Sequence, residues 1–252
     1  DDGYSSVSRS KFYNLKYIVI NNKMPDELYV KTIDVGLAST VVQLFKLQQQ
    51  MIDYLWERID IAKKKKSCHK RELAGHISQS YKLDDPQNLV IQNLYKIVND
   101  PGNNPKMVEF IQREIENVYR RNGLENRIIE PYLTDLWVNF QKKGEFQPIH
   151  NHGGIFSFVI WMDIPYHYKD EAKLPSAKSS LKQPPGGNFT FVTANGINRG
   201  MNNHIIPMSP EMNGYCCFFP SDLTHQVYPF YTSDKDRITI SGNISYRTEE
   251  PN

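Results

Sequence analysis

The sequence predicts an α+β protein in which a mainly helical N-terminal half braces a β-rich C-terminal half. Up to about residue 122 apolar side chains recur with a helical period, and from about Leu133 the period changes to two, as in strands. The 15 Tyr and 12 Phe residues also favour β-rich packing. We expect one domain over residues 1–252, with helical support over 1–130 and a core over 131–252.

Three helices are expected in the N-terminal half. The first is predicted to start at Ser39 or Thr40, because Ser and Thr are good N-caps and an apolar stripe follows. A second covers 88–99, and a third runs from Asn104-Pro105 to Gly123, with proline in its first turn and glycine at its end. A strand is expected over 12–20, and the segment 67–87 is left open between strand and loop.

Many short strands separated by turns are expected in the C-terminal half, which is typical of a sandwich or jelly roll. A turn over 142–145 separates the first two strands. Long loops over 165–186 and 196–203 are expected to border the mouth of a substrate site. The expected strands lie at 136–140, around 150–152, at 155–163, 188–192, 204–206, 215–219 and 237–245.

Composition argues against several classes of protein. The formal net charge is +2, which gives no reason to expect nucleic acid or a membrane surface as the main partner. The four lysines at 63–66 are interpreted as a solvated helix end. No apolar run reaches the roughly 18 residues of a membrane span. An odd cysteine count argues against a disulfide framework and favours a cytoplasmic protein; the cysteines are Cys68, Cys216 and Cys217.

A pair of histidines carries the strongest chemical signal. His150 and His152 share one face of an extended strand, because side chains alternate along it. With His225, which follows a distant apolar strand, they offer three corners of a metal site. A histidine taken alone is more often a packed or surface residue. Structural zinc is a weaker alternative, because closed zinc sites favour cysteine ligands.

Arg237 opens the last predicted strand, on the same face as Thr239. A planar bidentate donor beside a hydroxyl suits the distal carboxylate of a small diacid. The other interpretation of Arg237 is a surface ion pair. Three metal ligands followed by such an arginine are what an iron enzyme with a dicarboxylate cosubstrate needs.

The order of these motifs over residues 133–247 resembles the iron(II)/2-oxoglutarate-dependent oxygenases, specifically their prolyl 4-hydroxylase-like branch. Within that branch it is most similar to an uncharacterised 2-oxoglutarate–iron(II) oxygenase group. The resemblance implies a double-stranded β-helix, or jelly roll. The motifs that carry it are Gly144, His150-x-His152, Trp161-Met162, Gly186-Gly187-Asn-Phe-Thr-Phe191, Phe219-Pro220, His225 and Arg237.

The resemblance implies that His150 and His225 bind iron(II) and that Arg237 binds the C5 carboxylate of 2-oxoglutarate. Ascorbate is a candidate reductant. The reaction implied is hydroxylation of an unactivated C–H bond by O₂, in a prolyl residue or small amino acid, so the substrate is a small molecule or a peptidyl group. No catalytic residue beyond the metal centre is expected. Further residues expected to bind the cosubstrate or line its pocket are Thr239, Trp161, Asn139 and Ser157.

His152 departs from the family pattern, which has Asp or Glu at this position. Three outcomes are open. In the first, His152 is the third ligand. In the second, the third corner is empty or filled by water, and His152 itself takes the first-ligand position with Gly154 after it, a His-x-Gly pattern like that of halogenases. In the third, the site is inactive.

Two other functions stay open from the sequence. A three-histidine dioxygenase of the cupin type would insert O₂ into its substrate without a 2-oxo acid. A non-enzymatic jelly-roll module would keep the histidines for packing or for zinc. The sequence tells neither the substrate nor the oligomeric state.

Overall fold

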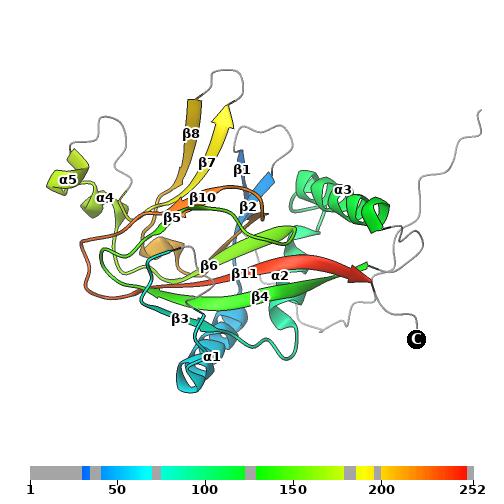
Figure 1. Cartoon of the computed structure of the whole chain (residues 1–252), viewed down its shortest axis with the longest axis horizontal. Coiled ribbons are helices and arrows are strands. Elements are labelled where there is room, and N and C mark those ends of the chain that lie inside the picture. The colour runs from blue at the N-terminus through cyan, green and yellow to red at the C-terminus, as the bar shows by residue number, and fades with distance from the viewer. Residues whose placement is uncertain are drawn as a thin grey trace, which may run out of the picture.

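The computed structural model describes residues 30–34, 41–69, 75–122, 129–178, 186–195 and 200–248. The strand expected over 12–20 lies outside these ranges. The described chain contains helices and two antiparallel sheets, which confirms the predicted α+β class (Figure 1).

The larger sheet has seven strands in the order β1-β2-β9-β6-β11-β4-β3, all paired antiparallel. β11 and β4 are the longest pair, and their register runs from Arg237 opposite Gln141 to Thr248 opposite Ile129. The strand bounds are β1 Val30–Asp34, β2 Val41–Lys46, β3 Gln79–Lys82, β4 Ile129–Gln141, β6 Phe156–Asp163, β9 Tyr215–Pro220 and β11 Arg237–Thr248.

The smaller sheet has four strands in the order β5-β10-β7-β8 and lies above the long strands in Figure 1. Its strands are β5 Gln147–His150, β7 Phe189–Asn195, β8 Gly200–Ile206 and β10 His225–Val227. β10 pairs with β5 on one side and with β7 on the other, so His225 stands opposite both His150 and Phe191. The short strand β10 was not predicted from the sequence.

Register and burial together show how the large sheet uses its two faces, because residues opposite each other on neighbouring strands share a face. On one face, Phe158 and Phe218 belong to a hydrophobic cluster that includes buried side chains of three helices. On the other face, Val159 and Cys217 belong to a second cluster together with Phe189 and other residues of the small sheet. The first cluster therefore lies between the large sheet and the helices, and the second lies between the two sheets.

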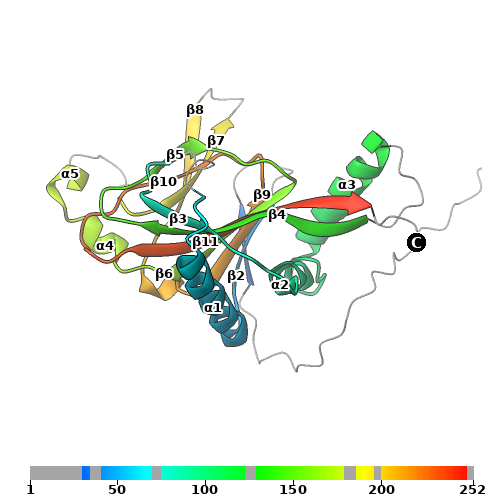
Figure 2. The same ribbon diagram turned by 60° about the horizontal axis from the view of Figure 1, so that its bottom comes forward.

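The helices that contribute to the first cluster are α1 Gln49–Lys65, α2 Leu89–Val98 and α3 Pro105–Asn122. Figure 2 shows α1 and α2 on the side of the large sheet away from β5, β7, β8 and β10. The predictions for the second and third helices are confirmed. The predicted start of the first helix was wrong: residues 41–46 form β2, and the helix begins ten residues after Ser39, at Gln49.

The segment 165–186, expected to be a loop, carries two single-turn helices, α4 Tyr168–Glu171 and α5 Pro175–Lys178. A 3-10 turn, η2 Pro210–Met212, precedes β9. The three cysteines are free, and Cys216 and Cys217 point into different clusters. Within the ranges that the structure describes, no helix has an apolar stretch long enough to span a bilayer.

Candidate metal centre

Three imidazoles converge between the two sheets. One ring nitrogen each of His150, His152 and His225 lies within 4.8 Å of the others. His150 closes β5 and His225 opens β10, so the antiparallel register places them opposite each other. His152 lies just beyond β5 and not within it, and its Nε2 is 3.2 Å from Nε2 of His225. The histidine cluster expected from the sequence is present.

The backbone fixes the orientation of two of these rings. Nδ1 of His150 lies 2.6 Å from the carbonyl oxygen of Pro148, and Nδ1 of His225 lies 2.9 Å from that of Leu223. Since a carbonyl can only accept, Nδ1 carries the proton in both rings and donates it. The lone pair of Nε2 is then free for a metal, as in many metal-binding histidines.

His152 is held by its backbone. Its N–H donates to the carbonyl oxygen of Ser221 over 2.9 Å. Two residues later Gly154 has φ +89°, a left-handed conformation that side chains rarely adopt, and a Cβ there would lie 2.9 Å from the carbonyl oxygen of Ile244. The glycine lets the chain turn tightly against β11 and return to β6.

Burial keeps these imidazoles neutral. It lowers the pKa of His150, and it lowers that of His152 to about 4, with a further effect from His150. Burial also holds the pKa of His225 well below its usual value, and the two neighbouring histidines act in the same direction. Neutral imidazoles are the form that binds a metal.

The nitrogen positions fit a metal ion. Two ligand nitrogens at about 2.1 Å from one ion, at angles between octahedral and tetrahedral, lie roughly 3.0–3.4 Å apart. The 3.2 Å between His152 and His225 falls in this range. Three nitrogen ligands on one side leave further positions open, as in non-haem iron enzymes. The other four histidines lie outside the cluster: His69, His76, His167 and His204.

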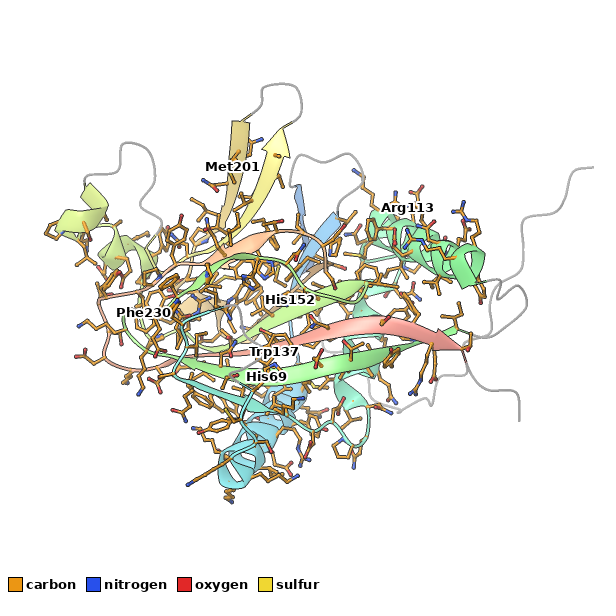
Figure 3. The ribbon with its side chains drawn as sticks, viewed as in Figure 1. His69, Arg113, Trp137, His152, Met201 and Phe230 are labelled. Atoms are coloured by element: carbon orange, nitrogen blue, oxygen red, sulfur yellow. The ribbon has the colours of Figure 1, made fainter. Side chains whose placement is uncertain are left out.

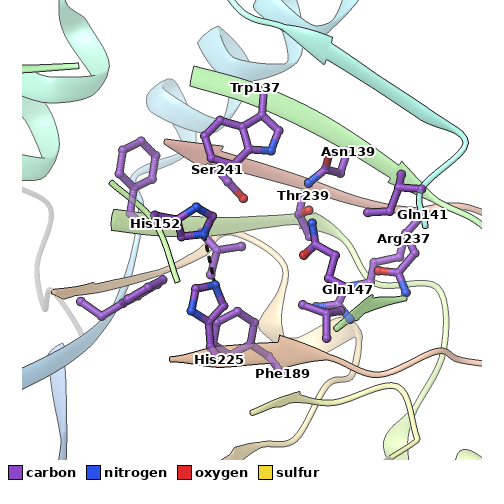
Figure 4. A pocket seen from close by; sticks show the side chains of 15 residues that line it. Trp137, Asn139, Gln141, Gln147, His152, Phe189, His225, Arg237, Thr239 and Ser241 are labelled. Carbon is purple, nitrogen blue, oxygen red and sulfur yellow. Dashed lines mark hydrogen bonds between the residues drawn. The ribbon is translucent and has the colours of Figure 1, made fainter. Parts of the chain in front are cut away.

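A pocket beside the histidines is lined by polar side chains of β4 and β11 (Figure 4). Facing residues on these strands form three cross-strand pairs that run away from His152 towards Arg237. The pairs are Trp137 with Ser241, Asn139 with Thr239, and Gln141 with Arg237.

Arg237 ends this row, and its side chain is almost fully buried, with 1% exposed. Its Nη1 donates to the hydroxyl oxygen of Tyr166 over 3.1 Å and approaches the carbonyl of Gly187 at 3.4 Å. Its Nε is buried without a hydrogen-bond partner. Among the described residues no carboxylate forms an ion pair with it, so the guanidinium charge is left for a ligand.

Of the other residues predicted to belong to the site, Asn139 and Thr239 line the pocket, and Oδ1 of Asn139 is buried without a partner. Ser157 and Trp161 do not line it. The hydroxyl of Ser157 donates to Asn243 Oδ1 over 2.9 Å and lies 2.9 Å from the hydroxyl of Ser221. Trp161 packs edge-to-face on Phe189, and its indole nitrogen is buried without a partner.

Sequence reasoning missed several pocket residues. Trp137 lies between His69, on which it stacks at 5.0 Å, and His152, whose ring centre is 5.8 Å away, near the middle of the molecule in Figure 3. Alternation along the strand could have found it, because it precedes Asn139 by two residues. Tyr166 carries no such signal, since it lies in an irregular segment. The other missed residues are Gln141, Gln147 and Ser241.

Residues 135–243 match a protein-family model described as "Putative 2OG-Fe(II) oxygenase". A search of curated proteins gives no match. This family match confirms the resemblance noted in the sequence.

The chain also overlaps several solved structures. A prolyl-4-hydroxylase of Pseudomonas putida has 14% identity and a TM-score of 0.46, covering 83% of this chain and 93% of that chain. The viral collagen prolyl hydroxylase of Paramecium Bursaria Chlorella virus-1 in a 2OG complex has 14% identity and a TM-score of 0.40, covering 86% and 95%.

The matched segment contains all three cross-strand pairs of the polar row, including Arg237, and the three histidines. Residues 135–243 of this chain are therefore similar to the 2OG-Fe(II) oxygenases, enzymes that use iron(II) and 2-oxoglutarate.

Proposed function

We propose that this protein is an iron(II)- and 2-oxoglutarate-dependent hydroxylase whose iron is held by His150, His152 and His225. One observation carries the proposal: a single space between two sheets joins a cluster of three neutral imidazoles to a buried arginine that has no acidic partner in the described chain. A dicarboxylate with a 2-oxo acid at one end can satisfy both ends of that space.

Arg237 and Tyr166 are the residues we assign to the distal carboxylate of 2-oxoglutarate. The guanidinium offers a planar fork of donors in a water-poor site, where charge-assisted hydrogen bonds are strong. Burial raises the pKa of Tyr166, against the effect of Arg237, so its phenol keeps its proton. Tyr166 therefore fixes the direction of the guanidinium without adding a negative charge.

Asn139 and Thr239 form the middle pair of the row, and we assign them to the chain of the cosubstrate between its two ends. Ser157 supports the site from behind, because its partner Ser221 also provides the carbonyl that holds His152. Trp161 stands directly opposite Thr239 on β6, so its indole N–H remains a predicted donor on the same face of the sheet.

Three neutral ligands suit this chemistry. With no carboxylate among them, iron(II) keeps its full double positive charge and favours an anionic, bidentate 2-oxo acid. When bound, iron(II) with O₂ supplies the oxidising power, coupled to loss of CO₂ from 2-oxoglutarate to give succinate. The protein contributes binding, orientation and exclusion of water.

The fold proposed for the core is the double-stranded β-helix. Two facing antiparallel sheets with the metal ligands between them support it, and the shared hydrophobic cluster supports bracing by the N-terminal helices within one domain. For the substrate we propose a prolyl residue or small amino acid, as a free molecule or within a peptide, on the basis of the resemblance to prolyl 4-hydroxylases.

A second candidate function is a three-histidine dioxygenase that needs no 2-oxo acid. The absence of Asp or Glu from the histidine cluster favours it, within the described residues. Arg237 argues against it, because such an enzyme has no need of a buried, unpaired guanidinium beside the metal.

Anaerobic titration with iron(II) and then 2-oxoglutarate tests the proposal. A visible charge-transfer band is expected when the 2-oxo acid chelates the iron. Iron binding without the band would favour the three-histidine dioxygenase, and a protein that binds no iron would contradict both enzymes.

A further inference from the structure

Glu171 is the most deeply buried carboxylate in the described chain, with 1% of the residue exposed. It ends α4 and has no cationic partner among the described residues. Its oxygens accept hydrogen bonds from the N–H of Tyr231 at 3.0 Å, the N–H of Thr232 at 2.8 Å and the hydroxyl of Thr232 at 2.5 Å. A buried charge held only by neutral donors is costly, so its retention calls for a reason.

The hydrogen bonds of Glu171 join two segments of the chain that contact each other near Arg237. One segment carries Tyr166, five residues earlier, and the other carries Phe230, just before the residues that Glu171 binds. The rings of Tyr166 and Phe230 stack with centres 4.5 Å apart and planes inclined by 16°. The second segment leads directly into β11, whose first residue is Arg237.

Further hydrogen bonds to the backbone connect the same two segments through Gly187. The N–H of Gly187 donates to the carbonyl of Pro229 over 2.9 Å, and the carbonyl of Gly187 accepts from the hydroxyl of Tyr166. Phe230 is fully buried, and Figure 3 shows it at the end of the molecule where α4 lies. The stacked pair thus contacts the guanidinium through the hydroxyl of Tyr166, and Glu171 fastens the two segments that carry the rings.

We propose that Glu171 is a positioning residue for the cosubstrate: it holds Tyr166, stacked on Phe230, against Nη1 of Arg237, so that the guanidinium presents its fork to the distal carboxylate. The inference rests on the proposed function. It assigns part of the segment 165–186 to recognition of the diacid.

Charge and position predict opposite results at this residue, which makes the inference testable. The negative charge of Glu171 acts on Tyr166, where it raises the pKa. By charge alone, neutralising Glu171 would tighten binding of an anion beside Arg237. If the hydrogen bonds of Glu171 instead set the position of Tyr166 and Phe230, neutralising Glu171 weakens binding of the anion.

The test compares Glu171→Gln with Asp170→Asn. Glutamine keeps the shape but turns an NH₂ group towards N–H donors. Asp170 is the matched control, because it is an exposed neighbour of equal charge whose carboxylate pairs with Lys173 on the surface. Affinities for 2-oxoglutarate and for pyruvate, which lacks the distal carboxylate, are measured on the anaerobic iron(II) protein.

Glu171→Gln is expected to weaken 2-oxoglutarate binding about tenfold and to leave the pyruvate and iron(II) affinities unchanged, the scale of one or two lost hydrogen bonds. Asp170→Asn is expected to change none of them. Unchanged or tighter 2-oxoglutarate binding in Glu171→Gln would overturn the inference, as would an equal loss for pyruvate.

A second variant keeps the inference open to test if Glu171→Gln does not fold. Thr232→Val removes one of the donors at constant shape, so 2-oxoglutarate affinity should fall severalfold while pyruvate affinity holds; equal effects on both acids would contradict the inference. Failure of the proposed function looks different, because the unmodified iron(II) protein would then not bind 2-oxoglutarate.

Discussion

Arg237 and Tyr166 meet over 3.1 Å at the buried end of the polar row, far apart in sequence but fixed against each other. The hydrogen bond to the neutral phenol of Tyr166 sets the direction in which the guanidinium points. The affinity of Arg237 for a dicarboxylate therefore depends on this geometry as well as on its charge.

Arg237→Lys keeps the charge but loses the planar fork. We expect 2-oxoglutarate affinity to fall about 10- to 100-fold, since a lysine cannot bind the carboxylate bidentately and leaves Tyr166 without its donor. Equilibrium titration of the anaerobic iron(II) protein measures this. Arg247→Lys is the control, because Arg247 lies exposed on the same strand and pairs with Glu130. Equal affinities in the two variants would remove Arg237 from the site.

His152→Ala tests the departure from the family pattern. Two ligands alone should bind iron(II) at least about 100-fold more weakly, beyond the loss typical of a group that merely supports a ligand. Calorimetry under anaerobic conditions gives the affinity. His76→Ala is the control, because His76 stacks on Phe146 outside the cluster. Undiminished iron binding in His152→Ala would show that His152 is not a ligand.

Acid should destabilise the metal-free protein. Folding lowers the pKa of all three cluster histidines, His152 to about 4, whereas the unfolded chain protonates them near 6.5. The unfolded state therefore binds more protons below pH 6.5, and stability falls as the pH drops from 6.5 towards 4. Urea unfolding at pH 8, 6 and 5 checks this. His152→Asn should flatten the profile, and an unaltered profile would count against burial as the cause.

Gly242→Ala should destabilise the sheet. A Cβ at this position would lie 2.5 Å from Cζ of Phe158 and 2.9 Å from the backbone oxygen of Asp135. Overpacking of this kind costs about 1–3 kcal/mol. Urea unfolding gives the difference from the unmodified protein. Gly153→Ala is the matched control, because a Cβ there meets nothing within 4 Å; a similar loss in both would contradict the packing argument.

The chemistry of the site was readable from the sequence where residue type and spacing decide it. His150 and His152, two residues apart, meet His225 because β5 and β10 pair. The direction of His152 was inferred from an extended strand, but His152 lies just beyond the end of β5. A backbone hydrogen bond to Ser221 holds it in place instead.

The start of the first helix could not be predicted, because the apolar spacing of the helix continues backwards through the preceding strand, β2. Leu44 belongs to β2 and Met51 to α1, yet their spacing suits one helix. Pairing of β2 with β9, about 170 residues further along the chain, decides the outcome. Tyr166 was missed for the same kind of reason, since its place depends on long-range contacts with Arg237 and Phe230.

Two of the three candidate metal ligands lie on a different sheet from Arg237. His150 and His225 lie on the small sheet, and Arg237 lies on the large one, with aromatic side chains such as Phe219 and Phe189 as spacers between them. The distance from the metal position to the guanidinium therefore depends on the spacing between the two sheets. A core substitution that changes this spacing would impair binding of a five-carbon diacid at both of its ends, so a mutation can abolish the proposed activity without altering a residue of the site.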